Sequence, residues 1–180
     1  MFQDGSPLGR AIYGLAKATA LAGGIALLGL VVLVVVSVFG RAFIWAGLRP
    51  VYGDYELVEK GVGFAIFAFL PWAHLTRSHA LVTLITDRFG DAVNRVILVI
   101  TDVMMLAASS FIAWRLYYGM LDKFAYGETT LMLRIPLGWG YMAGFAGALV
   151  FAIVSVYVLG RSLSAAIRGE NEPSAQGAHL

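Results

Sequence analysis

The chain contains no cysteine among its 180 residues. This absence excludes disulfide frameworks, thiol nucleophiles, thiolate zinc sites and iron–sulfur clusters. Histidine is also scarce, with only His74, His79 and His179 in the whole chain. A membrane haem held by paired imidazoles needs two well-placed histidines, and only His74 is placed to lie at the end of an apolar run. A di-haem anchor is therefore not expected.

Charged residues are few as well, at 13% of the chain against roughly 25% in soluble domains. The net charge is only +2, and the basic residues stand singly at the ends of apolar runs instead of forming a patch for nucleic acid. The sequence has no Gly-x-Ser-x-Gly, no phosphate-cradling glycine loop and no His-Glu-x-x-His. We therefore expect no catalytic, metal or cofactor site.

Long apolar runs dominate the remainder, since 59% of the residues are hydrophobic. Four runs approach the ~20 residues that cross a ~30 Å hydrocarbon core, at about 20–46, 57–75, 96–118 and 136–160. They predict an all-α membrane protein with four transmembrane helices in one domain over residues 1–168. The first run is too long for a signal-peptide core and should remain uncleaved. The polar residues 169–180 are predicted to form a disordered tail.

The distribution of Lys and Arg predicts the orientation of these spans. Seven basic residues fall on one side, namely Arg10, Lys17, Arg77, Arg88, Arg95, Arg161 and Arg168. Three fall on the other side, namely Arg49, Lys123 and Arg134. Because cytoplasmic loops carry the excess of positive charge, both termini are predicted to be cytoplasmic.

Two amphipathic segments are predicted to lie in the membrane interface. In the segment at about 79–94, Leu81, Ile85 and Phe89 keep helical spacing, with polar residues on the rest of the wheel. This helix either ties the second span to the third or docks a partner. The mildly apolar stretch from Leu8 to Thr19 is expected to lead into the first span as an interfacial helix.

Ionisable residues within the spans avoid the membrane centre, where each costs ~2.5–3.5 kcal/mol. Four of them are predicted near the outer boundary, namely Arg41, Glu59, Lys60 and Arg115. They are expected to form one pairing layer across the helices; contact with another membrane subunit and an ion or substrate path are the alternatives.

Two further features concern packing. Asp102 begins the second turn of the third span without a cation within four residues, and either bonds a neighbouring helix or serves as a lone proton-coupled site. Gly140-x-x-x-Gly144 in the fourth span has the spacing that lets two helix backbones approach closely. The partner helix belongs either to this chain or to another.

Several motifs, in order, carry a family resemblance. The first are Glu56-Leu-Val-Glu59 and, after an apolar span, Leu75-Thr-Arg77-Ser-His79-Ala-Leu-Val82. Gly127-Glu-Thr-Thr130 and Arg134-Ile-Pro-Leu-Gly-Trp139 follow. Together, over about residues 20–165, they resemble the small integral membrane subunit of tripartite ATP-independent periplasmic (TRAP) transporters. Thr83 departs from the family pattern, where an Asp often follows the His segment.

The resemblance implies a non-catalytic subunit of a secondary transporter in the bacterial inner membrane, driven by an ion gradient, usually sodium. It implies a large multi-span permease subunit of the elevator type as partner, and a periplasmic binding protein that delivers an organic acid. Candidate structural or subunit-interface residues are Arg41, Glu59, Arg77, His79, Asp102, Arg115, Gly140 and Gly144. Alternatives are a membrane anchor of a respiratory enzyme and a small proton-coupled exporter.

Overall fold

The computed structural model describes residues 7–76 and 91–168, with side chains for 7–76 and 96–168. Its elements are the α-helices α1 (Pro7–Ala42), α2 (Asp54–Leu75), α4 (Asp91–Ala125) and α5 (Leu137–Arg168), and the 3₁₀-helix η1 (Ile44–Ala46). Apart from one isolated bridge between Thr129 and Pro136, these residues form no β-structure. The predicted all-α class is confirmed for the part of the chain described.

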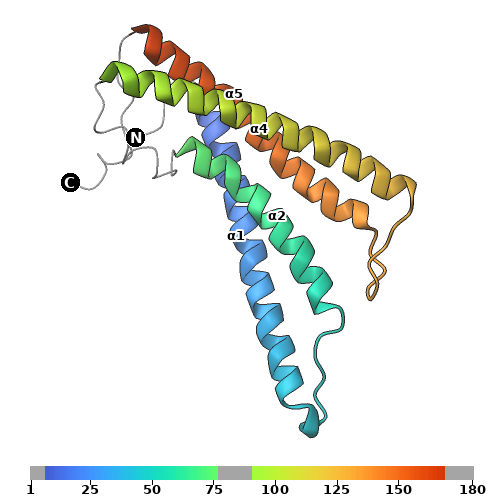
Figure 1. Cartoon of the computed structure of the whole chain (residues 1–180). Helices are drawn as coiled ribbons and strands as arrows, with labels where there is room; N and C mark the ends of the chain where they lie inside the picture. Colours follow the sequence, from blue (N-terminus) through green and yellow to red (C-terminus); the bar gives the residue numbers. More distant parts are fainter. Residues whose placement is uncertain (1–6, 77–90, 169–180) are drawn as a thin grey trace, which may run out of the picture.

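The helices form two hairpins, α1 with α2 and α4 with α5, which spread apart like the arms of a V (Figure 1). The hairpins meet mainly where α2 packs against α5, and α1 and α4 do not touch. We call the end that carries η1 and residues 126–136 the loop end. The opposite end, where α1 begins and α5 finishes, is the terminal end.

A small apolar core joins both hairpins at the terminal end. Ala16 of α1 and Val154 of α5 are fully buried, and Leu75 at the end of α2 packs with them. The rings of Tyr13 and Trp72 meet edge to face at 5.2 Å between centroids. Three helices are therefore fixed to one another here, while α1 leaves α5 toward the loop end.

Helix α1 corrects the prediction of a separate interfacial helix at 8–19. Residues 7–42 form one continuous helix, which begins at Pro7, a residue favoured in the first helical turn. Ile12 and Ala16 pack in the core. A single continuous helix allows this packing and also carries the long apolar stretch that follows. Residues 91–94 of the other predicted interfacial helix belong to α4; the remainder of that segment and the tail lie outside the described residues.

Three of the four expected spans meet the requirements of length and composition. Helix α1, residues 96–125 of α4 and residues 137–167 of α5 are each long and apolar enough to cross a membrane. Helix α2 has 22 residues, about 33 Å at 1.5 Å per residue, but its first two turns carry four charged residues. These are Asp54, Glu56, Glu59 and Lys60. The fourth span thus stays a prediction.

Large apolar side chains line the outside of the molecule. Between Leu21 and Phe39 of α1 the exposed side chains are aliphatic or Phe, as at Ile25, Leu28, Val32 and Phe39. Such a surface suits hydrocarbon, because lipid tails are as apolar as these side chains.

Candidate subunit interface

The small residues of α5 pack against α2 of the same chain. A Cβ at Gly147 would lie 2.8 Å from the Phe67 Cβ and 2.9 Å from the Phe67 backbone, so only glycine allows this approach. About one turn nearer the loop end, a Cβ at Gly144 would lie 3.3 Å from the Phe67 ring. About two turns nearer, a Cβ at Gly140 would lie 2.7 Å from the Lys60 Cδ. The predicted Gly140-x-x-x-Gly144 spacing therefore serves packing within the chain.

Arg41 has a partner other than those expected. Its guanidinium lies 3.4 Å from the Asp54 carboxylate, which also accepts the Ser37 hydroxyl at 2.5 Å. Ser37 is buried, and the Asp54 side chain is only 17% exposed. The Ser37 hydrogen bond, with help from the Tyr55 backbone N–H and Arg41, holds the pKa of Asp54 below its ordinary value, although desolvation opposes this. These contacts join the loop ends of α1 and α2.

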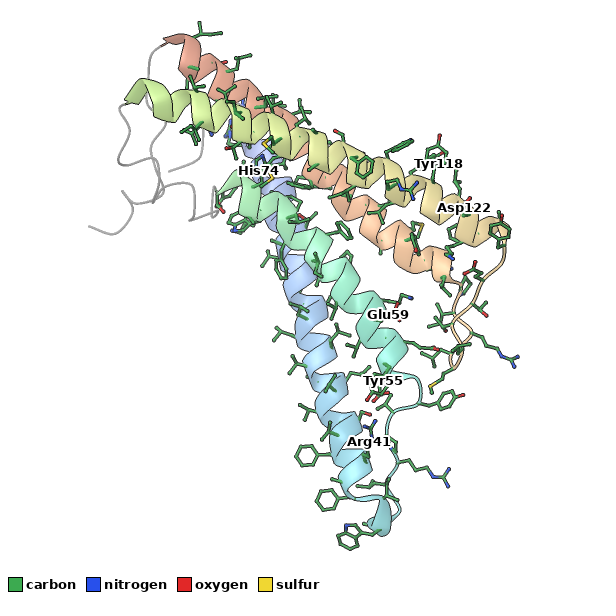
Figure 2. All side chains as sticks on the ribbon, viewed as in Figure 1. Arg41, Tyr55, Glu59, His74, Tyr118 and Asp122 are labelled. Carbon is green, nitrogen blue, oxygen red and sulfur yellow. The ribbon has the colours of Figure 1, made fainter. Side chains whose placement is uncertain are left out.

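The single layer of charges predicted across the spans does not form. Glu59 is 73% exposed and pairs with its neighbour Lys60 at 2.8 Å, away from Arg41 (Figure 2). Arg115 lies exposed on α4, with no hydrogen bond or ion pair to any described side chain. Among the described helices, α4 packs only against α5, which has no acidic residue to offer it.

Glu56 joins the two hairpins at the loop end. Its Oε1 accepts the backbone N–H of Met132 at 2.7 Å, and its Oε2 accepts that of Leu133 at 2.9 Å. Desolvation raises the pKa of Glu56, but the hydrogen bonds from Met132 and Leu133 outweigh it, so the pKa lies below its ordinary value. Gly53 packs against the same segment, because a Cβ there would lie 2.5 Å from the Leu133 Cγ. We call this set of contacts the Glu56 latch.

The loop that Glu56 holds, residues 126–136, is itself tightly bonded. The Thr130 N–H donates to the Ile135 carbonyl at 2.9 Å, and the Ile135 N–H donates back to the Thr130 hydroxyl at 3.1 Å. At its base, the Leu137 N–H donates to the Glu128 carbonyl at 2.9 Å. Within the loop Arg134 has φ of 55°, the only positive φ outside glycine in the described residues.

Asp102 takes part in a buried contact at the terminal end. The Ser162 hydroxyl of α5 donates to its carboxylate, and both side chains are almost fully buried. His74 is also buried, at the end of α2 (Figure 2). Its ring meets the Phe151 ring edge-on, with centroids 5.7 Å apart. The expected helix-to-helix hydrogen bond of Asp102 is thus present, with α5 as its partner.

Two of the candidate residues, Arg77 and His79, lie outside the described residues. Within 7–76 and 96–168, where side chains are described, no three His, Cys, Asp or Glu side chains gather as a metal site would require.

Comparison with known families decides the assignment. Residues 30–165 match the family described as tripartite ATP-independent periplasmic transporters, DctQ component. The chain belongs to this family. No curated protein and no solved structure matches it. The resemblance read from the sequence motifs is confirmed, and the chain is a small membrane component of a TRAP transporter and a multi-pass protein of the inner membrane.

Three of the four motifs that suggested a TRAP subunit meet at the loop end; the motif that begins at Leu75 starts at the opposite end of α2 and continues outside the described residues. Glu56 from the first motif bonds the segment between Thr130 and Arg134, which are the end of one later motif and the start of the next. Both groups are therefore parts of one structural unit, the latch with its loop. Reasoning from the sequence treated them as separate signatures.

Sequence reasoning about this DctQ component overlooked three residues that hold it together. Ser37 and Ser162 each donate to a carboxylate on another helix, and Asp54 is the partner of Arg41. Asp54 could have been found, because an Asp directly after a glycine at the start of a helix is favoured by the helix dipole. A lone serine inside an apolar run offers no comparable signal.

Proposed function

We propose that the chain is the non-catalytic scaffold of its TRAP transporter. In this role it packs against a large permease that moves substrate, and gives that permease a fixed support in the membrane. The chain does not itself move the substrate. The large permease and a periplasmic binding protein are its proposed partners, with membrane lipids around the rest.

The observation that carries this proposal is that the hairpins are tied at both ends. At the loop end the Glu56 latch bonds α2 to residues 132–133. At the terminal end the core of Ala16, Leu75 and Val154 joins α1, α2 and α5. A V of helices braced at its vertex and between its arms resists changes in its opening angle, which suits a support better than a moving part.

The buried polar groups also favour a structural role. The hydroxyls of Ser109 and Ser155 are fully buried and donate to carbonyls of their own helices, at 3.0 Å to Leu106 and 2.9 Å to Phe151. Ser37 and Ser162 each donate to one carboxylate. Each of these hydroxyls therefore has an acceptor within the chain, whereas a path for ions or substrate needs polar groups in succession across the membrane.

Finer features of the function are proposed from the distribution of charge and from the family resemblance. We propose that residues 57–75 of α2 are a fourth span, with Asp54 and Glu56 outside the membrane-spanning segment. We also propose that both termini are cytoplasmic and that the loop end faces the periplasm, which follows the positive-inside distribution of Lys and Arg. Transport is proposed to use a sodium gradient and to import an organic acid handed over by the binding protein.

The first test is extraction of the tagged chain from its native membrane with a mild detergent, followed by mass spectrometry and an absorbance scan. We expect a stoichiometric multi-span permease and no haem band. A chain that purifies alone as a homo-oligomer, or together with a haem enzyme, would overturn the proposal.

A second test addresses the coupling. The purified complex in liposomes should take up a radiolabelled organic acid only when the binding protein and an inward sodium gradient are both present. An equal potassium gradient is the control. Uptake by the small chain alone would contradict a scaffold role.

A further inference from the structure

We propose that residues 126–136, the α4–α5 loop, form a docking surface for a water-soluble partner protein, with Leu131 and Arg134 as its main contacts. The inference rests on the proposed function, in which a periplasmic binding protein visits the membrane subunits. It goes further by assigning the contact to this chain and to one loop.

The loop lies outside the hydrocarbon core, and its conformation is fixed before any partner binds. It connects two helices that each qualify as membrane spans, and irregular backbone is not tolerated where it would face lipid. The Glu56 latch and the paired hydrogen bonds between Thr130 and Ile135 hold its shape. A loop fixed in advance loses little conformational entropy when a partner binds.

The loop presents large apolar side chains at its surface. Leu131 at its tip is 95% exposed, Tyr126 is 78% exposed and Met132 is 50% exposed. Tyr52, next to the Gly53 that packs on Leu133, is 70% exposed and extends the same surface. Tyr, Met and Arg are enriched in protein interfaces, so this composition favours a protein as the occupant.

Arg134 supplies the independent observation. Its φ of 55° lies in the left-handed region, where a Cβ strains the backbone and glycine or asparagine fits best. Its side chain is exposed and forms no hydrogen bond or ion pair within the described part of the chain. The Arg134 side chain therefore strains the backbone, and no hydrogen bond or ion pair within the described residues offsets that strain. Strained residues of this kind cluster at binding sites, which points to a contact outside the chain.

The charges around the loop define the chemistry of the partner. Within the loop itself and the facing residues 49–56, the carboxylates of Asp54, Glu56 and Glu128 are engaged, Glu128 by Lys123 at 2.6 Å. Arg49 and Arg134, in contrast, are exposed cations without a side-chain partner among the described residues. The matching surface on the partner therefore carries carboxylates beside an apolar pocket that takes Leu131.

Photocrosslinking in the native membrane identifies the occupant. Benzoylphenylalanine replaces Leu131 in the intact transporter, and replaces Leu28 as a control, which is 69% exposed in the middle of α1. We expect Leu131→benzoylphenylalanine to capture the periplasmic binding protein, identified by mass spectrometry, and the Leu28 control to capture none. Crosslinks from position 131 only to the permease, to lipid or to a second copy of this chain would overturn the proposal.

Substitution of Arg134 separates binding from folding. Arg134→Gly relieves the backbone, so the variant should unfold at the same or a higher temperature, yet bind purified binding protein at least tenfold more weakly. Arg134→Lys should retain part of the affinity, and Arg134→Glu should lose the most. Wild-type affinity in Arg134→Gly would overturn the assignment.

The two proposals fail in different ways. If the wild-type chain does not purify with a permease, the proposed function is wrong. If it does, and the Arg134 variants still bring the permease but bind the binding protein normally, only the docking surface is wrong.

Discussion

Glu56, in the first turn of α2, accepts the backbone N–H of Leu133 at 2.9 Å, although 77 positions separate the two residues. The other carboxylate oxygen accepts the N–H of Met132, so the pair forms a two-point contact between the hairpins. A carboxylate that accepts two backbone amides orients a loop more firmly than a single bond does, and charge-assisted hydrogen bonds are also stronger than neutral ones. The position of the α4–α5 loop thus depends on one side chain of α2.

Glu56→Ala should therefore loosen the loop without unfolding the helices. We expect a lower thermal midpoint and a broader distance distribution between spin labels on Tyr52→Cys and Tyr126→Cys, measured by electron paramagnetic resonance. The absence of native cysteine makes both labels specific. Glu59→Gln is the matched control, because Glu59 is 73% exposed and contacts only Lys60; it should change neither quantity. Equal distributions in Glu56→Ala and wild type would contradict the latch.

Acid should weaken the loop end through Asp54 and Glu56. Both pKa values are lowered in the folded protein, from ordinary values of 3.8 and 4.5. A lowered carboxyl pKa adds stability that is fully present above the ordinary value and is lost as pH falls through the folded value. The contribution of these two groups to the unfolding temperature in detergent should therefore be independent of pH above about 5.5, and the unfolding temperature should fall below pH 4. In Ser37→Ala this loss should be smaller, since its hydrogen bond is the main cause of the shift at Asp54. An unchanged acid profile would argue against that role.

The general architecture could be predicted from the sequence, whereas the contacts that hold it could not. Apolar runs indicated the helices, because hydrophobic length is set by the bilayer. Similar depth in the membrane suggested one charge layer with Arg41, yet the chain reversal at Gly47 and Gly53, with φ of 86° and 73°, brings Asp54 beside it instead. The depth of a residue in the membrane can be predicted from its position in an apolar run, but the direction that the chain takes after a turn cannot.

The latch was hidden for a different reason. Glu56 belongs to one of the sequence motifs, but the groups that donate hydrogen bonds to its carboxylate are backbone amides, which every residue except proline carries. No pattern of side chains marks Met132 and Leu133 as donors. The small-residue spacing of α5 did predict close packing, although only the structure identifies α2 as the helix that approaches Gly147.

Gly147→Ala should open the contact between α2 and α5. The new Cβ would meet the Phe67 backbone at 2.9 Å, and backbone cannot move aside as a flexible side chain can. Overpacking of this kind costs about 1–3 kcal/mol. Gly160→Ala on the same helix is the control, because nothing lies within 4 Å of its Cβ and alanine favours helix by up to about 1 kcal/mol. Unfolding measured in a series of detergent concentrations should show a lower stability for Gly147→Ala only. Equal stability of the two variants would contradict the observed packing.

Ser162→Ala and Asp102→Asn distinguish a structural carboxylate from a proton carrier. Loss of the Ser162 hydroxyl removes a donor from the buried Asp102 and should cost about 1–3 kcal/mol. Asp102→Asn keeps the size and an oxygen that can still accept from Ser162, but it cannot bind and release a proton near neutral pH. If Asp102 only joins α4 to α5, Asp102→Asn should assemble with the permease and sustain uptake at close to the wild-type rate. Because a proton-coupled exporter built around this residue would lose its driving reaction, an assembled but inactive Asp102→Asn variant would revive that alternative and remove the scaffold role.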